Sequence, residues 1–347
     1  MRFGLIGFGG IGQVRKAAIE QAPGCSLTAV FDTNRELAKQ LDSGVRFFDS
    51  VESLVSSDAC DAVIISTPTN FHVEQSIAAM EGGKHVIVEK PMASSLQQCA
   101  QMLKVSRDTG KVLTVGFNHR YFAAVKEVRN AIQSGAIGKL SYVRAYTGHT
   151  GLSEFKSPWM YDKDVMGGGT LMDNGIHVLD LTRHLMGGVN SVCGFALTDI
   201  WKLDRSEDNG FALMRGPDGV VGTLHSSWSE WKGYRFYVEA YGDKGMARAY
   251  YAPMMSTVIT MDKPGGKRNV KRNFYPAAMF REKFKGWQST VIQTFVEEIA
   301  DFIALTRGQQ PSGYIAQAED GYRVAEIANA VYESSDTGQQ VVMAENI

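Results

Sequence analysis

The chain has 347 residues, of which 44% are hydrophobic and 21% are charged, and this composition excludes a disordered protein. The 36 Lys and Arg residues nearly balance the 37 Asp and Glu residues, which gives a net charge of -1. A surface with that balance is not built to bind nucleic acid or an anionic membrane, so we expect neither partner.

The four cysteines are widely spaced and form no Cys-x-x-Cys pair, which favours reduced thiols over a disulfide framework or a zinc site. No apolar stretch reaches the roughly 18 residues that a transmembrane helix requires. We therefore expect a cytoplasmic protein. At about 100–200 residues per domain, the length predicts two domains.

The first 120 residues alternate short apolar runs with stretches of helical spacing, such as residues 34–41 and 71–81. Near-continuous apolar strands that alternate with helices are typical of a parallel sheet covered on both faces. We predict an α/β fold in which residues 1–120 form an NAD(P)-binding Rossmann domain with a doubly wound parallel sheet. Its strands are expected at residues 2–6, 26–32, 45–48, 61–66, 85–89 and 111–117.

The second part of the chain changes to strands of alternating character, at residues 139–147, 209–228 and 234–251. Pro-Asp-Gly and Gly-Asp-Lys-Gly turns predict antiparallel hairpins within the last two segments. We predict that residues 121–347 form an α+β substrate-binding and catalytic domain with an open, mainly antiparallel sheet. Helices are expected near 170–186, 289–306 and 314–333, and the C-terminal ones either stay with this domain or pack back on the first.

A glycine-rich turn, Gly-x-Gly-x-x-Gly, is formed by Gly7, Gly9 and Gly12 directly after the first predicted strand. Glycine lets backbone N–H groups approach a pyrophosphate at the amino end of the following helix. Asp32 ends the second strand, where it would accept hydrogen bonds from ribose hydroxyls and repel a 2′-phosphate. The pattern therefore predicts NAD as the cofactor rather than NADP, a preference that the nearby Arg35 would weaken.

A second polar segment, residues 66–70, follows the fourth strand, where the strand order reverses and a ligand crevice opens. Its side chains either hold the nicotinamide half of the cofactor or form a simple turn in which Asn70 caps the next helix. The predicted cofactor-binding residues are Gly7, Phe8, Gly9, Gly10, Ile11, Gly12, Asp32, Thr67, Pro68, Asn70, Glu89 and Lys90.

Lys90 follows the fifth strand in the sequence Glu89-Lys90-Pro91, at the strand end that faces the ligand crevice. A lysine at this position can donate a hydrogen bond to a substrate hydroxyl and stabilise the alkoxide that forms from it. The alternative is an ion pair with Glu89 or with another neighbour.

Four ionisable residues, Asp173, His177, Asp180 and His184, form one stripe of a predicted helix. Because apolar residues flank this stripe on both sides, its carboxylates and imidazoles need partners and indicate a pocket. Asp173 also fits a capping box with Thr170, and His177 also fits a hydrogen-bonded core histidine. For Asp180 and His184 we favour a structural role. No second cluster with metal-ligand spacing accompanies the stripe, so we predict no metal site.

These motifs together resemble those of the Gfo/Idh/MocA oxidoreductases, a family that includes glucose–fructose oxidoreductase and inositol dehydrogenases. The resemblance rests on Gly-Phe-Gly-Gly-Ile-Gly with Asp32, on Glu-Lys-Pro at 89–91, and on Gly-Gly-Gly-x-x-x-Asp-x-Gly-x-His-x-x-Asp at 167–180. It extends to Gly-Phe-Asn-His-Arg at 116–120 and to the strand-rich second half, so it spans the chain.

The resemblance implies that Lys90, Asp173 and His177 are the catalytic residues and that the Lys90–Pro91 peptide is cis. It implies an NAD(P)-dependent oxidoreductase that transfers hydride between nicotinamide and a secondary alcohol of a sugar, sugar derivative or cyclitol. Neutral His177 would take the hydroxyl proton, Lys90 would stabilise the oxygen, and Asp173 would hold or polarise the site. A homodimer or homotetramer formed through the open sheet of the second domain is also implied.

Several further side chains are candidates for binding the substrate. Asn118 and Arg120 follow the sixth strand and could bind its hydroxyls or a carboxylate, although Asn118 also fits a helix cap. Trp159 and Tyr161 either stack on a sugar ring or form a buried hinge, and His149 is a further candidate. The predicted substrate-binding residues are Lys90, Asn118, Arg120, Trp159, Asp173 and His177.

Two other functions are compatible with the same residues. One is a redox-neutral glycosidase or lyase that retains NAD and works through a transient keto-sugar. The other is a non-catalytic sugar or dinucleotide sensor, which we expect to have lost the Lys-Asp-His set that this chain keeps. The basic stretch 263–272 is typical of a solvated hairpin, or else would receive the phosphates of a nucleotide-sugar.

Overall fold

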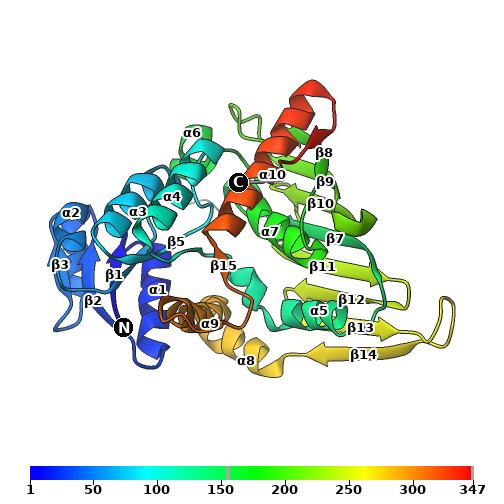
Figure 1. Ribbon diagram of the computed structural model, residues 1–347, viewed down its shortest axis with the longest axis horizontal. Helices are drawn as coiled ribbons and strands as arrows, with labels where there is room; N and C mark the ends of the chain where they lie inside the picture. Colours follow the sequence, from blue (N-terminus) through cyan, green and yellow to red (C-terminus); the bar gives the residue numbers. More distant parts are fainter. Residues whose placement is uncertain (154–156, 345–347) are drawn as a thin grey trace. The chain divides into compact units, whose positions relative to one another are not determined.

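The computed structural model describes residues 1–153 and 157–344, which fall into two units (Figure 1). The first unit contains Met1–Tyr121 together with Arg281–Tyr322. The second contains Phe122–Phe280 and the segment from Arg323 onward. Each unit is built on one sheet.

Six parallel strands form the sheet of the first unit in the order β3-β2-β1-β4-β5-β6, and β15 adds an antiparallel strand beside β6. The predicted doubly wound Rossmann sheet is thereby confirmed, with the strand order reversing between β1 and β4. All four residues of β4 are buried, as a strand covered on both faces requires. The strands are β1 (Arg2–Ile6), β2 (Ser26–Phe31), β3 (Arg46–Phe48), β4 (Ala62–Ile65), β5 (His85–Val88), β6 (Leu113–Val115) and β15 (Ala316–Gln317).

The core of the first unit joins its sheet to a helix from the C-terminal part of the chain. Phe295 and Phe302 of this helix, α9, pack with Phe3 and Leu5 of β1. The predicted helix at 34–41 is only a 3₁₀-helix, and none of its residues is buried, so no packing stabilises a longer α-helix there. The helices are α1 (Gly10–Gln21), α2 (Val51–Val55), α3 (His72–Glu81), α4 (Leu96–Thr109) and α9 (Gln288–Thr306), with 3₁₀-helices η1 (Arg35–Gln40), η2 (Thr69–Phe71) and η3 (Asn118–Tyr121).

Arg15 of α1 is fully buried and binds two carboxylates of the first unit. Its Nε donates to Oε1 of Glu89 at 2.6 Å, its Nη1 donates to Glu298, and its guanidinium lies 3.5 Å from the ring centre of Phe295. A Cβ atom on Gly116 would come within 2.7 Å of this guanidinium, so glycine leaves the space that Arg15 fills. Arg15 therefore links α1, the end of β5 and α9.

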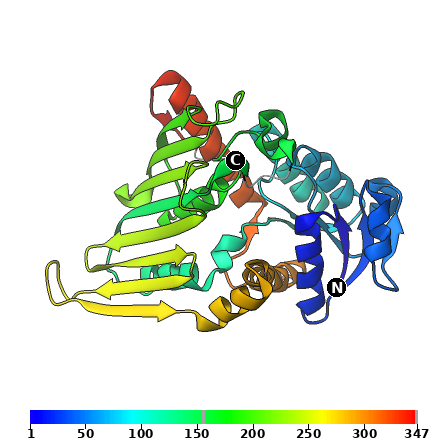
Figure 2. The ribbon, with the colours of Figure 1, turned by 180° about the vertical axis from the view of Figure 1, so that it is seen from behind.

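Nine strands form the sheet of the second unit in the order β14-β13-β12-β11-β7-β10-β9-β8-β16 (Figure 2). All neighbours in this sheet are antiparallel except β7 and β10, which run parallel, so the predicted mainly antiparallel sheet is confirmed. The strands are β7 (Leu140–Gly148), β8 (Ser191–Leu197), β9 (Asn209–Arg215), β10 (Val221–Ser227), β11 (Arg235–Gly242), β12 (Gly245–Tyr251), β13 (Met255–Thr260), β14 (Asn269–Phe274) and β16 (Val341–Val342).

Two helices of the second unit pack on its sheet, α7 against β7 and β10 and α5 against β12 and β13. The basic stretch 263–272 covers the turn between β13 and β14 and the first residues of β14, where Lys271 pairs with Glu127 at 2.8 Å. The remaining helices are α5 (Ala123–Gln133), α6 (Lys163–Met166), α7 (Gly175–Met186), η4 (Gly151–Ser153), η5 (Pro158–Tyr161) and η6 (Pro217–Gly219). Helices α8 (Pro276–Lys285) and α10 (Ala318–Thr337) contain residues of both units.

The helix predicted from residue 170 begins five residues later, at Gly175. Residues 170–174 form a turn instead, in which the N–H of Gly175 donates to the carbonyl of Thr170 at 2.8 Å. The N-terminal residue that flanks α7 is Asn174, and its side chain makes no capping hydrogen bond. Asp173 thus precedes the helix, whereas His177, Asp180 and His184 lie on it.

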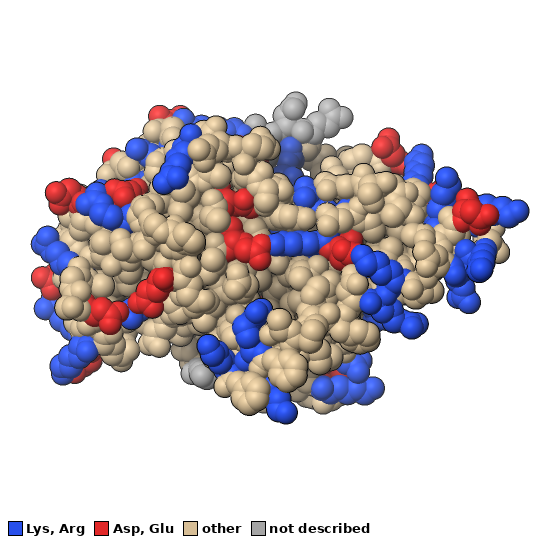
Figure 3. Space-filling view, turned by 90° about the horizontal axis from the view of Figure 1, so that it is seen from below, with Lys and Arg blue, Asp and Glu red and all other residues tan. Residues whose placement is uncertain are grey.

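Over the described residues, no helix is long and apolar enough to cross a membrane, and no group of three or more His, Cys, Asp and Glu side chains is arranged to hold a metal ion. On the face drawn in Figure 3, basic and acidic side chains are interspersed, as the balanced composition predicts.

Replacing Arg15 with Ala leaves the carboxylates of Glu89 and Glu298 buried without their counter-charge. We expect the free energy of unfolding to fall by about 3–5 kcal/mol, the usual cost of removing one partner of a buried ion pair. Urea unfolding followed by circular dichroism measures this loss. Arg2→Ala, which breaks an exposed pair with Asp61, is the matched control and should have little effect. Equal losses for the two variants would contradict the account of Arg15.

Candidate functional site

The carboxyl ends of the parallel strands bring the predicted cofactor-binding segments to one edge of the first sheet. After β1, the N–H of Gly7 donates to Phe31 of β2 at 2.9 Å, and the N–H of Ser66 donates to Ile6 at 2.8 Å. The N–H of Glu89, after β5, donates to Ile65 at 3.0 Å. Four segments that are far apart in the sequence therefore end side by side, at the strand edge where α/β proteins bind ligands.

The glycine-rich turn has the shape that a phosphate group needs. Gly7 has a φ of +91°, and a Cβ atom on it would lie 2.8 Å from the backbone of Ser66. A Cβ atom on Gly12 would lie 2.2 Å from the carbonyl oxygen of Gly7, so α1 can approach β1 only because residue 12 is glycine. Nothing lies within 4 Å of the Cβ positions of Gly9 and Gly10, where α1 begins. The amino end of α1 thus faces open space.

Asp32 is fixed next to this turn by two backbone donors. Its Oδ2 accepts from the N–H of Phe8 at 2.7 Å, and its Oδ1 accepts from the N–H of Asn34 at 2.8 Å. A carboxylate has about four acceptor positions, so Asp32 retains capacity for two hydroxyl groups. Arg35 forms an exposed ion pair with Asp49 at 3.1 Å.

His72, at the start of α3, ties together the loops that follow β4 and β5. The side chain is 1% exposed, with Nε2 at 2.9 Å from the carbonyl of Thr67 and Nδ1 at 3.0 Å from the carbonyl of Pro91. Burial lowers the pKa of His72, so the ring is neutral and its single N–H donates to one of these carbonyls. Thr67 also donates to Gln75 at 2.6 Å. Neither His72 nor Gln75 is among the residues predicted from the sequence.

The Lys90–Pro91 peptide is cis, as the family resemblance implies. The preceding carboxylate, Glu89, binds Arg15, so its predicted contact with the cofactor competes with a buried ion pair. Lys90 is partly exposed, and its charge adds to the burial that lowers the pKa of His119 to about 3. A cation therefore stands at the end of β5, beside a histidine that stays neutral.

Asn118 and Arg120 lie in η3 and are both buried in the first unit. Asn118 donates to Oγ1 of Thr294 at 3.1 Å. Arg120 donates to the carbonyl of Ile315 at 3.2 Å and to Asp320 at 3.4 Å. These contacts connect η3 to the C-terminal part of the first unit. The predicted binding of substrate by Asn118 and Arg120 stays a prediction.

In the second unit, Asp173 forms a buried cluster with two side chains. Its Oδ2 lies 3.0 Å from Nε2 of His149 and accepts from Nε1 of Trp228 at 3.1 Å. The N–H of Gly151 donates to Nδ1 of His149 at 3.0 Å, which leaves the ring proton on Nε2, facing Asp173. The exposed fractions of Asp173, His149 and Trp228 are 7%, 3% and 0%. Two N–H donors thus hold a carboxylate that water barely reaches.

The parallel pairing of β7 and β10 explains why these groups meet. Gly148 and Ser227, the last residues of the two strands, are register partners, and His149 and Trp228 follow them directly. His177 lies in the first turn of α7 and is 6% exposed. Trp159 lies in η5 and is partly exposed. Trp228 is a site residue that the sequence analysis missed.

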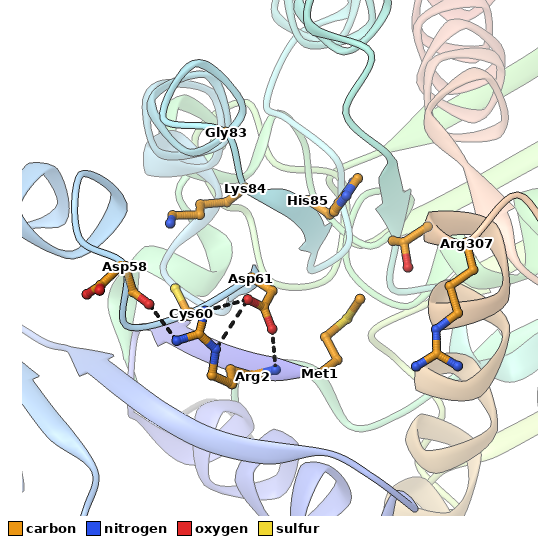
Figure 4. A pocket seen from close by; sticks show the side chains of 10 residues that line it. Met1, Arg2, Asp58, Cys60, Asp61, Gly83, Lys84, His85 and Arg307 are labelled. Atoms are coloured by element: carbon orange, nitrogen blue, oxygen red, sulfur yellow. Dashed lines mark hydrogen bonds and ion pairs between the residues drawn. The ribbon is translucent and has the colours of Figure 1, made fainter.

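A cavity of about 660 Å³ lies at the opposite edge of the first sheet, near the amino ends of β1 and β5 (Figure 4). Within it, Arg2 binds the carboxylate of Asp61 at 2.7 Å and the carbonyl of Asp58 at 2.6 Å. The ammonium of Lys84 donates to the carbonyl of Ser57 at 2.6 Å. These polar groups bind one another, and none of the predicted site residues lines this cavity.

Two family models match the chain. An oxidoreductase family with an NAD-binding Rossmann fold, GFO_IDH_MocA, matches residues 1–117, and the GFO/IDH/MocA C-terminal domain matches residues 125–248. The chain belongs to the Gfo/Idh/MocA oxidoreductase family. The family resemblance stated from the sequence motifs is confirmed, and the first unit carries the family's NAD-binding domain.

Individual members of the Gfo/Idh/MocA family match along nearly the whole chain. The chain is 27% identical to the myo-inositol 2-dehydrogenase of Thermotoga maritima, and the match covers 100% of both proteins. It is also 27% identical to the D-glucoside 3-dehydrogenase of Escherichia coli K12, over 91% of this chain and 89% of the relative. A solved structure of levoglucosan dehydrogenase in complex with NADH and L-sorbose is 26% identical, with a TM-score of 0.85 and coverage of 100% and 99%.

The residues of the first unit fit the NAD of the Gfo/Idh/MocA family. Open space at the Cβ positions of Gly9 and Gly10 suits a pyrophosphate against the amino end of α1. The fixed carboxylate of Asp32 suits the hydroxyls of a ribose. Thr67 and Pro68 lie in the loop after β4 and Asn70 lies in η2, next to the point where the strand order reverses.

Replacing Asp32 with Ala removes the acceptor for the ribose hydroxyls and the charge that repels a 2′-phosphate. We expect the ratio of NAD to NADP affinity to fall by about tenfold or more, since hydrogen bonds to a charged group contribute about 1.5–3 kcal/mol. Titration of protein fluorescence with each cofactor measures the ratio. Asp42→Ala, which removes an exposed carboxylate paired with Lys16, is the control. An unchanged ratio in Asp32→Ala would contradict the role given to Asp32.

Proposed function

We propose that this chain is an NAD-dependent dehydrogenase that oxidises a secondary alcohol of a sugar, sugar derivative or cyclitol. The observation that carries the proposal is the buried cluster of Asp173, His149 and Trp228 in the second unit, which also contains His177. The first unit of the same chain has a glycine-rich turn that suits a dinucleotide, and Lys90 follows its strand β5. The names of the relatives, an inositol dehydrogenase and a glucoside dehydrogenase, support the same substrate class. They favour a dehydrogenase over a redox-neutral glycosidase.

Each proposed catalytic residue has one task. His177 takes the proton of the substrate hydroxyl, because an imidazole is the side chain that most often serves as a general base. Lys90 donates a hydrogen bond to that oxygen and stabilises its negative charge as the carbonyl forms. Asp173, held by His149 and Trp228, keeps the site polar and oriented. When bound, NAD supplies the acceptor for the hydride that leaves the same carbon.

We further propose that Asn118, Arg120 and Trp159 bind the substrate ring and its hydroxyls. An indole face is suited to the C–H groups of a pyranose, and amide and guanidinium groups are suited to hydroxyl and carboxylate oxygens. Trp159 is partly exposed, which supports this role more directly than the buried positions of Asn118 and Arg120 do.

We also propose that copies of the chain associate through the open face of the second sheet, as a homodimer or a homotetramer. That sheet exposes Phe195 (63%) and Leu213 (52%), and Tyr142 stacks on Tyr241 with ring centres 4.4 Å apart. Exposed apolar and aromatic side chains on a sheet are typical of a surface that a partner covers. The cytoplasm is the proposed compartment, and the four free thiols support it, because disulfides are rare in that reducing environment.

The absorbance of reduced nicotinamide tests the proposed function. The protein is mixed with NAD, and separately with NADP, in the presence of aldoses, inositols and glycosides. We expect absorbance to rise with NAD and one class of these compounds. If no compound produces a rise and NAD stays bound to the purified protein, the proposed net oxidation is wrong and the redox-neutral reaction takes its place.

Replacing His177 with Ala should lower kcat by about 10²–10⁴-fold, the usual contribution of a general base, and leave NAD affinity unchanged. Steady-state kinetics and cofactor titration measure the two effects. His184→Ala, the same change two turns further along α7, is the matched control and should keep most of the activity. If Ala at 177 lowers NAD affinity and turnover equally, His177 is a structural residue.

A further inference from the structure

Three consecutive residues between β8 and β9, Ser206, Glu207 and Asp208, are almost fully buried although they belong to no helix or strand. The proposed reaction uses none of them. Glu207 is only 2% exposed, and a carboxylate so buried needs donors around it. Its donors lie within the second unit, on the turn that leads to Asp173.

Glu207 receives hydrogen bonds from three consecutive N–H groups of that turn. Its Oε2 accepts from Gly169 at 2.7 Å, and its Oε1 accepts from Leu171 at 2.7 Å. Its backbone carbonyl accepts from the N–H of Thr170 at 2.9 Å. The hydroxyl of Tyr332 on α10 donates to the same Oε1 at 3.1 Å. Glu207, supported by Tyr332, therefore holds residues 169–171 of the turn.

The close approach of the Tyr332 side chain and of the Glu207 backbone accounts for two of the three consecutive glycines. A Cβ atom on Gly168 would lie 2.0 Å from the hydroxyl oxygen of Tyr332. A Cβ atom on Gly169 would lie 2.0 Å from the carbonyl oxygen and 2.5 Å from the nitrogen of Glu207. Since real Cβ atoms do not come so close, the glycines let Glu207 and Tyr332 reach the backbone.

Two chains of hydrogen bonds connect the buried segment 206–208 to Asp173. On one side, the carbonyl of Gly169 accepts from the N–H of Asp173 at 3.0 Å, so the position of this backbone follows that of Gly169. On the other side, the carbonyl of Asp208 accepts from the N–H of Trp228 at 2.8 Å, and the indole of Trp228 donates to Asp173. Glu207 thus positions the Asp173 backbone through Gly169, and the adjacent Asp208 positions Trp228, which donates to the Asp173 carboxylate.

We propose that Glu207, supported by Tyr332, is a positioning residue that holds the turn 169–173 and thereby orients Asp173 for the reaction. The inference rests on the proposed dehydrogenase function. Glu207 itself touches neither the proposed catalytic residues nor a substrate, and it acts through the backbone of the turn. The ionised carboxylate is the effective form, because protonation replaces one of the acceptor positions that face Gly169, Leu171 and Tyr332 with an O–H donor.

The charge state of Glu207 gives this role a pH dependence. Burial raises the pKa of Glu207 to about 7, while the hydrogen bonds from Leu171, Gly169 and Tyr332 act in the opposite direction. Two other charged groups near these residues are Lys163 of α6, whose ammonium lies 5.6 Å from the ring centre of Tyr332, and the adjacent Asp208, whose carboxylate accepts from the N–H groups of Ile200 and Trp201 at 2.8 Å. As pH falls through this range, the carboxyl gains a proton, loses an acceptor position and releases the turn.

The experiment compares two variants of the full chain. Glu207→Gln replaces one acceptor oxygen with an NH₂ group that faces a backbone N–H, so the turn loses one of its hydrogen bonds. We therefore expect kcat to fall by about 10- to 100-fold, with the KM for NAD unchanged. Tyr332→Phe removes one donor that lowers the pKa of Glu207, so the acid limb of the kcat profile should move to higher pH. In the double variant the Tyr332 change should no longer shift the limb, because no carboxyl remains to titrate.

Tyr322→Phe, the same substitution earlier on α10, is the matched control and should leave the acid limb in place. A merely structural role for Tyr332 predicts reduced stability with an unshifted limb, and that result would overturn the proposal. So would a Glu207→Gln protein that is folded and retains the wild-type kcat.

A second readout separates this inference from the proposed function. The indole N–H resonance of Trp228, assigned with Trp228→Phe, reports the hydrogen bond to Asp173 without any turnover. We expect Glu207→Gln to shift this resonance, and an unshifted resonance in the folded variant would contradict the positioning role. Absence of hydride transfer in the wild-type protein, by contrast, would contradict the proposed function while the shift still tests Glu207.

Discussion

Arg15 lies fully buried between Glu89 and Glu298, and the arrangement of the first unit depends on this contact. Removing a guanidinium from water is costly, so the ion pair stabilises the fold only if both carboxylates remain in place. One of them stands at the end of β5, directly before Lys90, and the other is on α9. The contact therefore ties the segment that carries Lys90 to α1 of the glycine turn and to the C-terminal part of the unit.

In the second unit, buried carboxylates are stabilised by hydrogen bonds rather than by an ion pair. Asp173 is held by the indole of Trp228 and the imidazole of His149, and Glu207 is held by backbone N–H groups and Tyr332. A carboxylate that is buried with fixed donors stays oriented, which a reaction centre requires. In both units, buried charge thus determines the geometry around the proposed catalytic residues.

The sequence predicted the first unit closely because its strands are short, apolar and separated by helices. Residues 2–6 are the strand β1 as predicted, and each other predicted run contains its strand. The hairpins at 209–228 and 234–251 follow from local turn sequences, and their strands do pair antiparallel. The start of α7 was predicted five residues early, because the contacts that keep residues 170–174 out of the helix come from Glu207, which is distant in sequence.

What the sequence could not provide is the pairing of distant segments. Nothing local indicates that β7 runs parallel to β10, more than 70 residues further on, and that pairing brings His149 and Trp228 to Asp173. Arg15, His72 and Glu207 were missed for a related reason. Each is an ordinary polar residue in the sequence, and its importance comes from burial and from partners that only the fold supplies.

Transfer of deuterium from substrate to nicotinamide separates net oxidation from a redox-neutral reaction. A sugar or cyclitol that the protein oxidises is labelled with deuterium on the carbon that bears the reacting hydroxyl, and the nicotinamide product is analysed by mass spectrometry. We expect the released reduced nicotinamide to carry the deuterium, one label for each molecule of ketone formed. Label that remains in the sugar product, with no labelled reduced nicotinamide in solution, would contradict a net dehydrogenase.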